Sequence, residues 1–242
     1  MEDSTLALVG VTGGAGTTRT AVELAATLAR DGRSVAVIDS AFGTQGLATY
    51  VEGRITDDVT AVATGESAIG DALYDAGYDL PGRVAFCPAH APFERLARAK
   101  TPESARALET AVADAAGRFD HVLLDVPPVA ANPAVAALTV ADRRALVAPA
   151  TQRGRDLLPR QRGRLRDLDA PADDIVATWT DADDAVAIED AAIELPEGDP
   201  VGPDALDPTS SLAPAAASAA ETLFDTDLDL AFEDDGLLGR LS

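Results

Sequence analysis

Short apolar runs alternate with longer segments of helical periodicity along most of this chain. The first run, Leu6 to Val11, ends in a glycine-rich stretch, and residues 18–30 then space their apolar side chains three and four positions apart. A second run covers Ser34 to Ile38 and ends at Asp39. Similar runs follow at Val84 to Phe86, His121 to Leu124, Ala145 to Ala148 and Ile175 to Ala177. These runs predict buried strands separated by helices.

Buried strands that alternate with helices predict one fold class. A strand that is apolar throughout is covered on both faces, and a parallel connection has to cross the sheet, usually as a helix. We therefore predict an α/β fold with a doubly wound, mostly parallel sheet. The length of 242 residues allows one sizeable core. We place this domain at residues 1–224, where a last packed helix covers Ala215 to Phe224, and predict an acidic, flexible tail at residues 225–242.

The charge balance changes the expected environment rather than the fold. The chain has 41 acidic and 19 basic residues, a net charge of −22, and Lys100 as its only lysine. Excess carboxylate with arginine in place of lysine is typical of proteins that work in concentrated salt, so we predict a halophilic, archaeal host. The N-terminus lacks a basic segment, and no apolar stretch approaches the roughly 20 residues that span a bilayer. We expect a cytoplasmic protein without an integral membrane segment.

The loop after the first strand carries the candidate chemistry. Its glycines Gly13, Gly14 and Gly16 allow backbone N–H groups to point toward an anion at the start of a helix, where the helix dipole favours negative charge. Thr18 stands where a magnesium-binding hydroxyl is expected. A catalytically competent loop has a lysine directly before that residue, and here the position holds Thr17. The candidate nucleotide-binding residues, as a weak or vestigial site, are Gly13, Gly14, Ala15, Gly16, Thr17 and Thr18.

The order of these elements resembles the MinD/ParA family of P-loop ATPases, part of the deviant Walker A group that also includes CobQ and CobB. The family loop reads approximately Lys-Gly-Gly-Val-Gly-Lys-Thr, and Thr12 and Thr17 occupy both lysine positions here. Residues 35–39 are similar to the family's second strand, and residues 120–128 to its Walker B strand. The resemblance covers roughly Leu6 to Phe224. It implies ATP and Mg²⁺ as cofactors, with Thr18, Asp39 and Asp125 as the magnesium residues.

Further departures from the family pattern fall on chemistry rather than on scaffold. Ala41 stands at the family's second switch aspartate, and Thr178 or Trp179 stands where an asparagine reads adenine. Arg19 lies on the first helical turn, and we expect its side chain to point away from the loop. We therefore expect weak ATP and Mg²⁺ binding and a protein that is not an active ATPase.

A dense run of arginines follows the strand at Ala145 to Ala148, on an expected helix. The residues are Arg153, Arg155, Arg160, Arg162, Arg164 and Arg166. They form either a docking face for an acidic partner or DNA, or ion pairs with the chain's own carboxylates. The acidic surface argues against nonspecific attraction to nucleic acid, so we expect a protein partner before DNA.

Three functional hypotheses remain open at this point. The first is a degenerate MinD/ParA-like protein that acts by binding, as a partner of an active relative or of a positioned target in cell division, chromosome partitioning or surface-structure placement. The second is an active ATPase switch with an atypical loop. The third is a sensor that binds another anion at the helix N-terminus.

Overall fold

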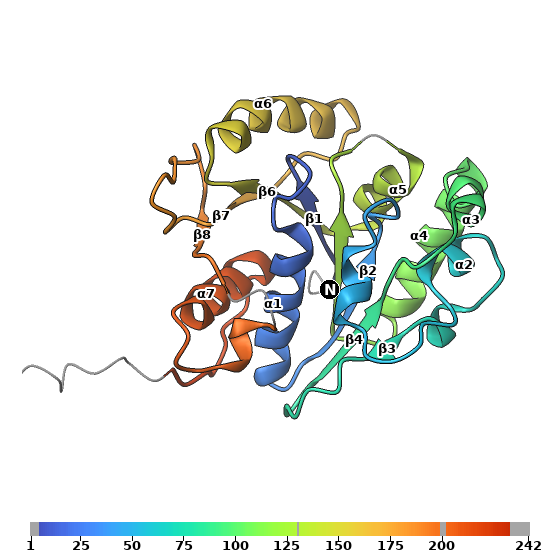
Figure 1. Ribbon diagram of the computed structural model, residues 1–242, viewed down its shortest axis with the longest axis horizontal. Helices are drawn as coiled ribbons and strands as arrows, with labels where there is room; N and C mark the ends of the chain where they lie inside the picture. The colour runs from blue at the N-terminus through green and yellow to red at the C-terminus, as the bar shows by residue number, and fades with distance from the viewer. Residues whose placement is uncertain (1–4, 130, 199–201, 233–242) are drawn as a thin grey trace, which may run out of the picture.

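A single sheet lies between two layers of helices in the computed structural model, which describes residues 5–129, 131–198 and 202–232 (Figure 1). The described residues form an eight-stranded sheet in the order β3-β4-β2-β5-β1-β6-β7-β8. All neighbouring strands run parallel except the β3/β4 pair. The predicted doubly wound α/β fold is therefore confirmed.

The elements have the following bounds. The strands are β1 (Thr5–Gly10), β2 (Ser34–Asp39), β3 (Tyr74–Asp75), β4 (Arg83–Cys87), β5 (His121–Val126), β6 (Arg143–Pro149), β7 (Asp174–Thr178) and β8 (Ile193–Leu195). The α-helices are α1 (Thr17–Arg30), α2 (Val59–Ala63), α3 (Phe93–Arg98), α4 (Pro102–Ala116), α5 (Asn132–Val140), α6 (Gln152–Asp167) and α7 (Leu212–Phe224). The 3₁₀ segments are η1 (Gly46–Tyr50), η2 (Ile69–Asp71) and η3 (Asp204–Leu206).

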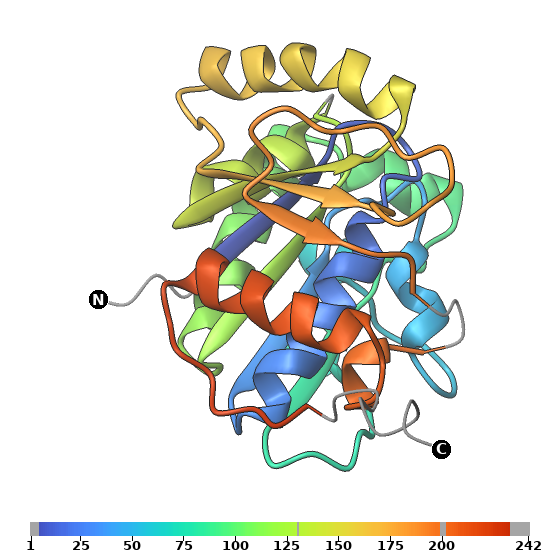
Figure 2. The ribbon, with the colours of Figure 1, turned by 90° about the vertical axis from the view of Figure 1, so that its left-hand side faces the viewer.

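Alternate residues of each strand pack into two separate parts of the hydrophobic core. Leu6 and Leu8 of β1 pack with α1 and α7, whereas Ala7 and Val9 pack with α2, α4, α5 and α6. Successive side chains of a strand point to opposite faces, so every central strand must be apolar throughout. Figures 1 and 2 show α7 beside α1 on one face, and α6 across the opposite face near the end where the glycine loop begins.

Helix α6 packs against β6 at very short range. A Cβ atom on Gly154 would lie 2.1 Å from the carbonyl oxygen of Pro149, so only glycine fits there. Thr151 caps the helix, because its hydroxyl oxygen accepts a hydrogen bond of 3.1 Å from the N–H of Gly154. The arginine-rich segment is thus a helix, as predicted, and it is held close to the sheet.

The carboxyl ends of the neighbouring strands β2, β5 and β1 lie together at one end of the sheet. β5 lies between β1 and β2, and Asp39 of β2 is in register with Asp125 of β5. On one side of β1 lie β5, β2, β4 and β3. On the other side lie β6, β7 and β8. Ligands of open parallel sheets bind beyond the carboxyl ends of the strands, at the point where the chain changes from one side of the sheet to the other. The fold therefore places the glycine loop beside both aspartates.

Two strands lie outside the sequence prediction, and part of the predicted tail contacts the domain. β3 and β8 are edge strands of two and three residues, too short to show a period. Residues after α7 run along the end of α1, where an N–H of Arg30 donates to the carbonyl of Ala231 at 3.1 Å and its guanidinium lies over the ring of Phe232. The predicted tail beyond residue 232 lies outside the described residues. Among the described helices, none combines the length and the apolar character needed to cross a membrane.

Candidate nucleotide-binding site

The glycine loop, residues 12–18, connects β1 to α1 and is fixed by side chains from two distant elements. Gly14 and Gly16 have φ angles of 73° and 83°, a left-handed conformation that favours glycine. The Thr178 hydroxyl donates to the carbonyl of Ala15 at 2.9 Å, and the Gln161 amide donates to the carbonyl of Gly10 at 3.3 Å. Both contacts are buried. The loop therefore keeps the geometry of an anion site at a helix N-terminus.

The three residues that the sequence predicts for magnesium lie together beside the loop, on what we call the magnesium side of the site. The Thr18 hydroxyl donates a hydrogen bond to Oδ2 of Asp125 at 2.5 Å. Asp39 lies in register beside Asp125, and its Oδ1 accepts a hydrogen bond of 2.8 Å from the N–H of Ala41. A hydroxyl and two carboxylates are oxygen donors of the kind that Mg²⁺ binds. These residues fit a magnesium ion that is also held by phosphate oxygens.

Burial strongly affects the charges of the two aspartates. Burial, followed by repulsion from Asp125, raises the pKa of Asp39 to about 7, while N–H groups of the backbone partly oppose the rise. Burial raises the pKa of Asp125 to about 6, against the hydrogen bond from Thr18. Two buried carboxylates that lie side by side favour a shared proton or a cation between them.

The lysine side of the site, where the family loop has its two lysines, holds Thr12 and Thr17 in this chain. Thr12 is buried, and Thr17 follows Gly16 as the first residue of α1. A Cβ atom on Gly10 would lie 2.8 Å from the Thr17 hydroxyl, so this side chain packs back against the end of β1. Both threonines are neutral. The two positions therefore supply no positive charge to a phosphate.

Arg19 is the nearest cation on α1, and carboxylates hold its guanidinium. Its Nε lies 2.5 Å from Oε1 of Glu23, and its Nη2 lies 3.2 Å from Oδ2 of Asp204. Glu23 is fully buried and also accepts hydrogen bonds from the N–H groups of Asp204 and Ala205. Burial raises the pKa of Glu23, and the Ala205 N–H and Arg19 oppose that rise. Arg19 therefore serves to join η3 to α1.

Three cavities lie in series along this edge of the sheet. Cavity A, of about 350 Å³, includes Thr20, Thr178, Leu195, Pro196 and Glu197. Cavity B, of about 510 Å³, is lined by the glycine loop, Thr49, Asp125 and their neighbours. Cavity C, of about 180 Å³, includes Ser40, Phe42, Gly43, Lys100 and Ala131.

Shared lining residues fix the order of these cavities. Cavities A and B share Gly16, Arg19, Tyr50 and Trp179. Cavities B and C share a different set, Ala41, Thr44, Pro127 and Pro128. No residue lines both A and C, so B lies between them. A long ligand with its phosphates on the glycine loop therefore has room at both ends.

The structure separates the two residues considered for base recognition. Thr178 points to the loop backbone, as described above. Trp179 is half-buried, has a φ angle of 60°, and lines both cavity A and cavity B. A left-handed conformation is uncommon for a bulky residue and occurs where surrounding structure imposes it. Trp179 therefore presents an aromatic surface at the junction of the two cavities.

The six arginines of α6 lie apart from this site. None of them lines cavity A, B or C. Arg162 forms an ion pair with Asp190 at 2.9 Å, and Arg164 donates to the carbonyl of Val129 at 2.9 Å. Arg153, Arg160 and Arg166 are exposed and form no ion pair within the described residues. Their charge therefore faces solvent on the outer side of α6.

Sequence reasoning did not find several residues that line the cavities. Tyr50 is the last residue of the short 3₁₀ segment η1, and Pro196 and Glu197 follow the short edge strand β8. These residues reach the site only through the three-dimensional fold. The one available signal was Lys100, because it is the only lysine in the sequence.

Comparisons with known proteins agree with this geometry. Residues 4–154 match the family model AAA_31, described as an AAA domain. A search of curated proteins finds no match. The fold is similar to MinD from Pyrococcus horikoshii, solved with Mg-ADP, with a TM-score of 0.73 and 19% identity over 90% of this chain and 95% of that one.

Two further solved structures show the same fold. The MinC:MinD complex from Aquifex aeolicus matches with a TM-score of 0.72 and 21% identity, over 94% of this chain and 98% of the other. A ParA family ATPase from Chlorobium tepidum matches with a TM-score of 0.71 and 14% identity, over 90% and 98%. The chain therefore belongs to the AAA_31 family, and its fold is that of the MinD/ParA-like P-loop ATPases.

Proposed function

We propose that this chain acts as a binding or regulatory partner in the spatial positioning of a cellular structure and has lost nucleotide hydrolysis. The observation that supports this proposal is the charge of the glycine loop. Thr12 and Thr17 stand at both lysine positions, and Arg19 is held by Glu23 and Asp204. Phosphoryl transfer depends on positive charge placed on the transferring group. Without it, the loop binds a phosphate but does not accelerate its transfer.

Weak binding of ATP and Mg²⁺ is part of this proposal. Thr18, Asp39 and Asp125 would hold the ion, and the N–H groups of the glycine loop would hold the phosphates. When bound, the ion would neutralise the two aspartates and the phosphate oxygens. Loss of a buried charge partner costs on the order of 3–5 kcal/mol, which lowers affinity from micromolar toward millimolar. Such a site would bind nucleotide without hydrolysing it.

The surface of α6 is the proposed partner-binding face. Arg153, Arg160 and Arg166 are exposed, and the remaining three arginines of the helix lie beside them. In a chain with a net charge of −22, a helix with six arginines favours an acidic partner by electrostatic complementarity. We propose an acidic protein, a MinD/ParA relative or the positioned target, before DNA. The solved relatives support this class of role, since they include a MinC:MinD complex and McdA.

Two variants separate a partner from a nucleotide-driven switch. The triple variant Arg153→Glu, Arg160→Glu, Arg166→Glu should remove the protein that co-purifies with the tagged chain from cells grown in high salt. Thr18→Ala should leave that protein bound, because binding does not require a nucleotide cycle. Release of the partner by Thr18→Ala, or retention by the triple variant, would contradict the proposal. Substitution of exposed Arg106 by Glu serves as a control for a charge reversal outside α6.

A second candidate function is an active ATPase switch with an atypical loop. The observation that favours it is the Thr18–Asp125 hydrogen bond of 2.5 Å, which keeps the magnesium side intact. It predicts phosphate release that Thr18→Ala abolishes. The partner proposal predicts that both proteins release phosphate at the same background rate.

A further inference from the structure

Lys100 lies at the end of the cavity series, on the side opposite to Trp179. It lines cavity C together with Ser40, while Trp179 lines cavities A and B. Lys100 is the only lysine in a chain whose other cationic residues are all arginines. Its side chain is exposed and forms no ion pair within the described residues. A lysine therefore stands next to the cavity whose own loop has none.

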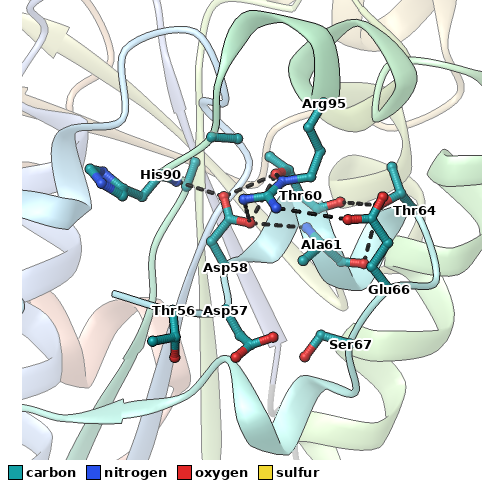
Figure 3. A network of polar contacts seen from close by, with 12 residues as sticks. Thr56, Asp57, Asp58, Thr60, Ala61, Thr64, Glu66, Ser67, His90 and Arg95 are labelled. Atoms are coloured by element: carbon teal, nitrogen blue, oxygen red, sulfur yellow. Dashed lines mark hydrogen bonds and ion pairs between the residues drawn. The ribbon is translucent and has the colours of Figure 1, made fainter. Parts of the chain in front are cut away.

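The backbone of Lys100 is fixed from both sides. Asn132, at the start of α5, donates a hydrogen bond of 2.9 Å to the carbonyl of Lys100. On the other side, α3 ends two residues earlier and is tied to α2 by a network of polar contacts (Figure 3). Its central contact joins Nη2 of Arg95 to Oδ1 of buried Asp58 at 3.0 Å.

The rest of this network strengthens the same connection. Asp58 caps α2 by accepting from the N–H of Ala61 at 3.0 Å, and it accepts from the N–H of His90 at 2.7 Å. Arg95 also donates to the hydroxyl of Thr60 at 2.9 Å, and Figure 3 shows these groups converging on one carboxylate. A buried carboxylate with several charge-assisted contacts orients its partners firmly. The turn that carries Lys100 is thus held in place, while its side chain is exposed.

The larger cavity A, beside Trp179, has more room for a base than cavity C, and this choice determines which part of a ligand Lys100 would meet. A nucleotide with its base in cavity A and its first phosphates on the glycine loop extends along cavity B toward Ala41 and Pro127. These two residues also line cavity C. The phosphate farthest from the base is therefore the one closest to Lys100. A lysine ammonium on its flexible stem is a common phosphate-binding group.

We propose that Lys100 binds the terminal phosphate of a nucleoside triphosphate and so distinguishes triphosphate from diphosphate in this site. The inference rests on the proposed function, in which the loop still binds a nucleotide without hydrolysing it. Lys100 approaches from the α3–α4 turn and contacts the end of the phosphate chain. A charge that contacts substrate and transition state equally tightens binding without accelerating transfer, and the loop positions Thr12 and Thr17 stay neutral.

The fluorescence of Trp179 provides the readout, because it is the only tryptophan of the chain and lines cavities A and B. Wild-type protein, Lys100→Ala, Lys100→Arg and the control Arg106→Ala are titrated with ATP, ADP, and ADP plus inorganic phosphate, with Mg²⁺ in one fixed salt concentration. Arg106 is exposed on α4 and lines none of the three cavities, and its substitution by alanine removes the same charge as Lys100→Ala. Phosphate release is followed in the same samples.

The proposal predicts that Lys100→Ala weakens ATP binding about tenfold and changes ADP binding by less than about twofold. Lys100→Arg should keep most of the preference for ATP, and Arg106→Ala should change neither affinity. Added inorganic phosphate should tighten ADP binding only when Lys100 is present.

Equal effects of Lys100→Ala on ATP and ADP, no effect on either, or no ATP binding by the wild-type protein would overturn the inference. The first two results leave the proposed function unchanged, and absent ATP binding removes its weak nucleotide site but not its partner role. Rapid phosphate release by the wild-type protein would instead contradict the proposed loss of hydrolysis, whatever Lys100→Ala does. The two failures are therefore distinguishable.

Discussion

The two sides of the glycine loop lie within one cavity but differ in the charges they present. On the magnesium side, Thr18 donates to Asp125 at 2.5 Å and Asp39 lies in register beside it. On the lysine side, Thr12 and Thr17 are neutral and pack against the protein. A functional phosphate site needs both sides, because the ion and the lysine neutralise different oxygens. Oxygen ligands without lysines are what the proposed function requires, in which the site binds but does not catalyse.

Restoring one lysine should give the largest change. Thr17→Lys should tighten Mg-ATP binding about a hundredfold or more, because a desolvated charge partner of a phosphate contributes on the order of 3–5 kcal/mol. Titration calorimetry measures the affinity. Thr49→Lys is the matched control, since Thr49 lines the same cavity outside the loop. Equal gains from both variants would show that general charge, and not the loop position, limits binding.

The aspartate pair should make stability depend on pH. Burial raises the pKa of Asp39 to about 7 and that of Asp125 to about 6, whereas aspartates of the unfolded chain titrate near about 4. The folded protein therefore binds protons more tightly, and its free energy of unfolding should fall as pH rises from about 4 to about 7. Asp125→Asn should reduce this slope and raise the free energy of unfolding at pH 8 by about 1–3 kcal/mol without Mg²⁺.

Denaturant unfolding across this pH range checks the prediction. Asp114→Asn is the control, because it removes one exposed carboxylate from α4 and leaves the buried pair intact. Mg²⁺ should stabilise the wild-type protein at pH 8 more than it stabilises Asp125→Asn. An unchanged pH slope in Asp125→Asn would mean that the two carboxylates do not carry the dependence.

Arg19→Ala should affect stability more than ligand binding. The substitution leaves Glu23 buried without its cation, although two backbone N–H groups still contact it, so unfolding should become easier by about 1–3 kcal/mol. The affinity for Mg-ATP should change by less than about threefold. A large loss of affinity with unchanged stability would identify Arg19 as a substitute for the missing lysine.

The sequence predicted the sheet, whereas its assignment of Thr18, Asp39 and Asp125 to magnesium stays a prediction. Apolar runs such as Ser34 to Ile38 mark central strands, and the pairing of β2 with β5 places Asp39 beside Asp125. β8 escaped prediction because three edge residues carry no period. Cavities A and C depend on contacts across the fold, so Trp179 and Lys100 could be placed only in the structure.

Steady-state phosphate release from Mg-ATP tests the central claim most directly. Purified wild-type protein is compared with Thr18→Ala, which lacks the hydroxyl that contacts Asp125. The account predicts that both proteins release phosphate at the same background rate in high salt. Turnover by the wild-type protein that Thr18→Ala abolishes would contradict the account and identify the chain as an active ATPase.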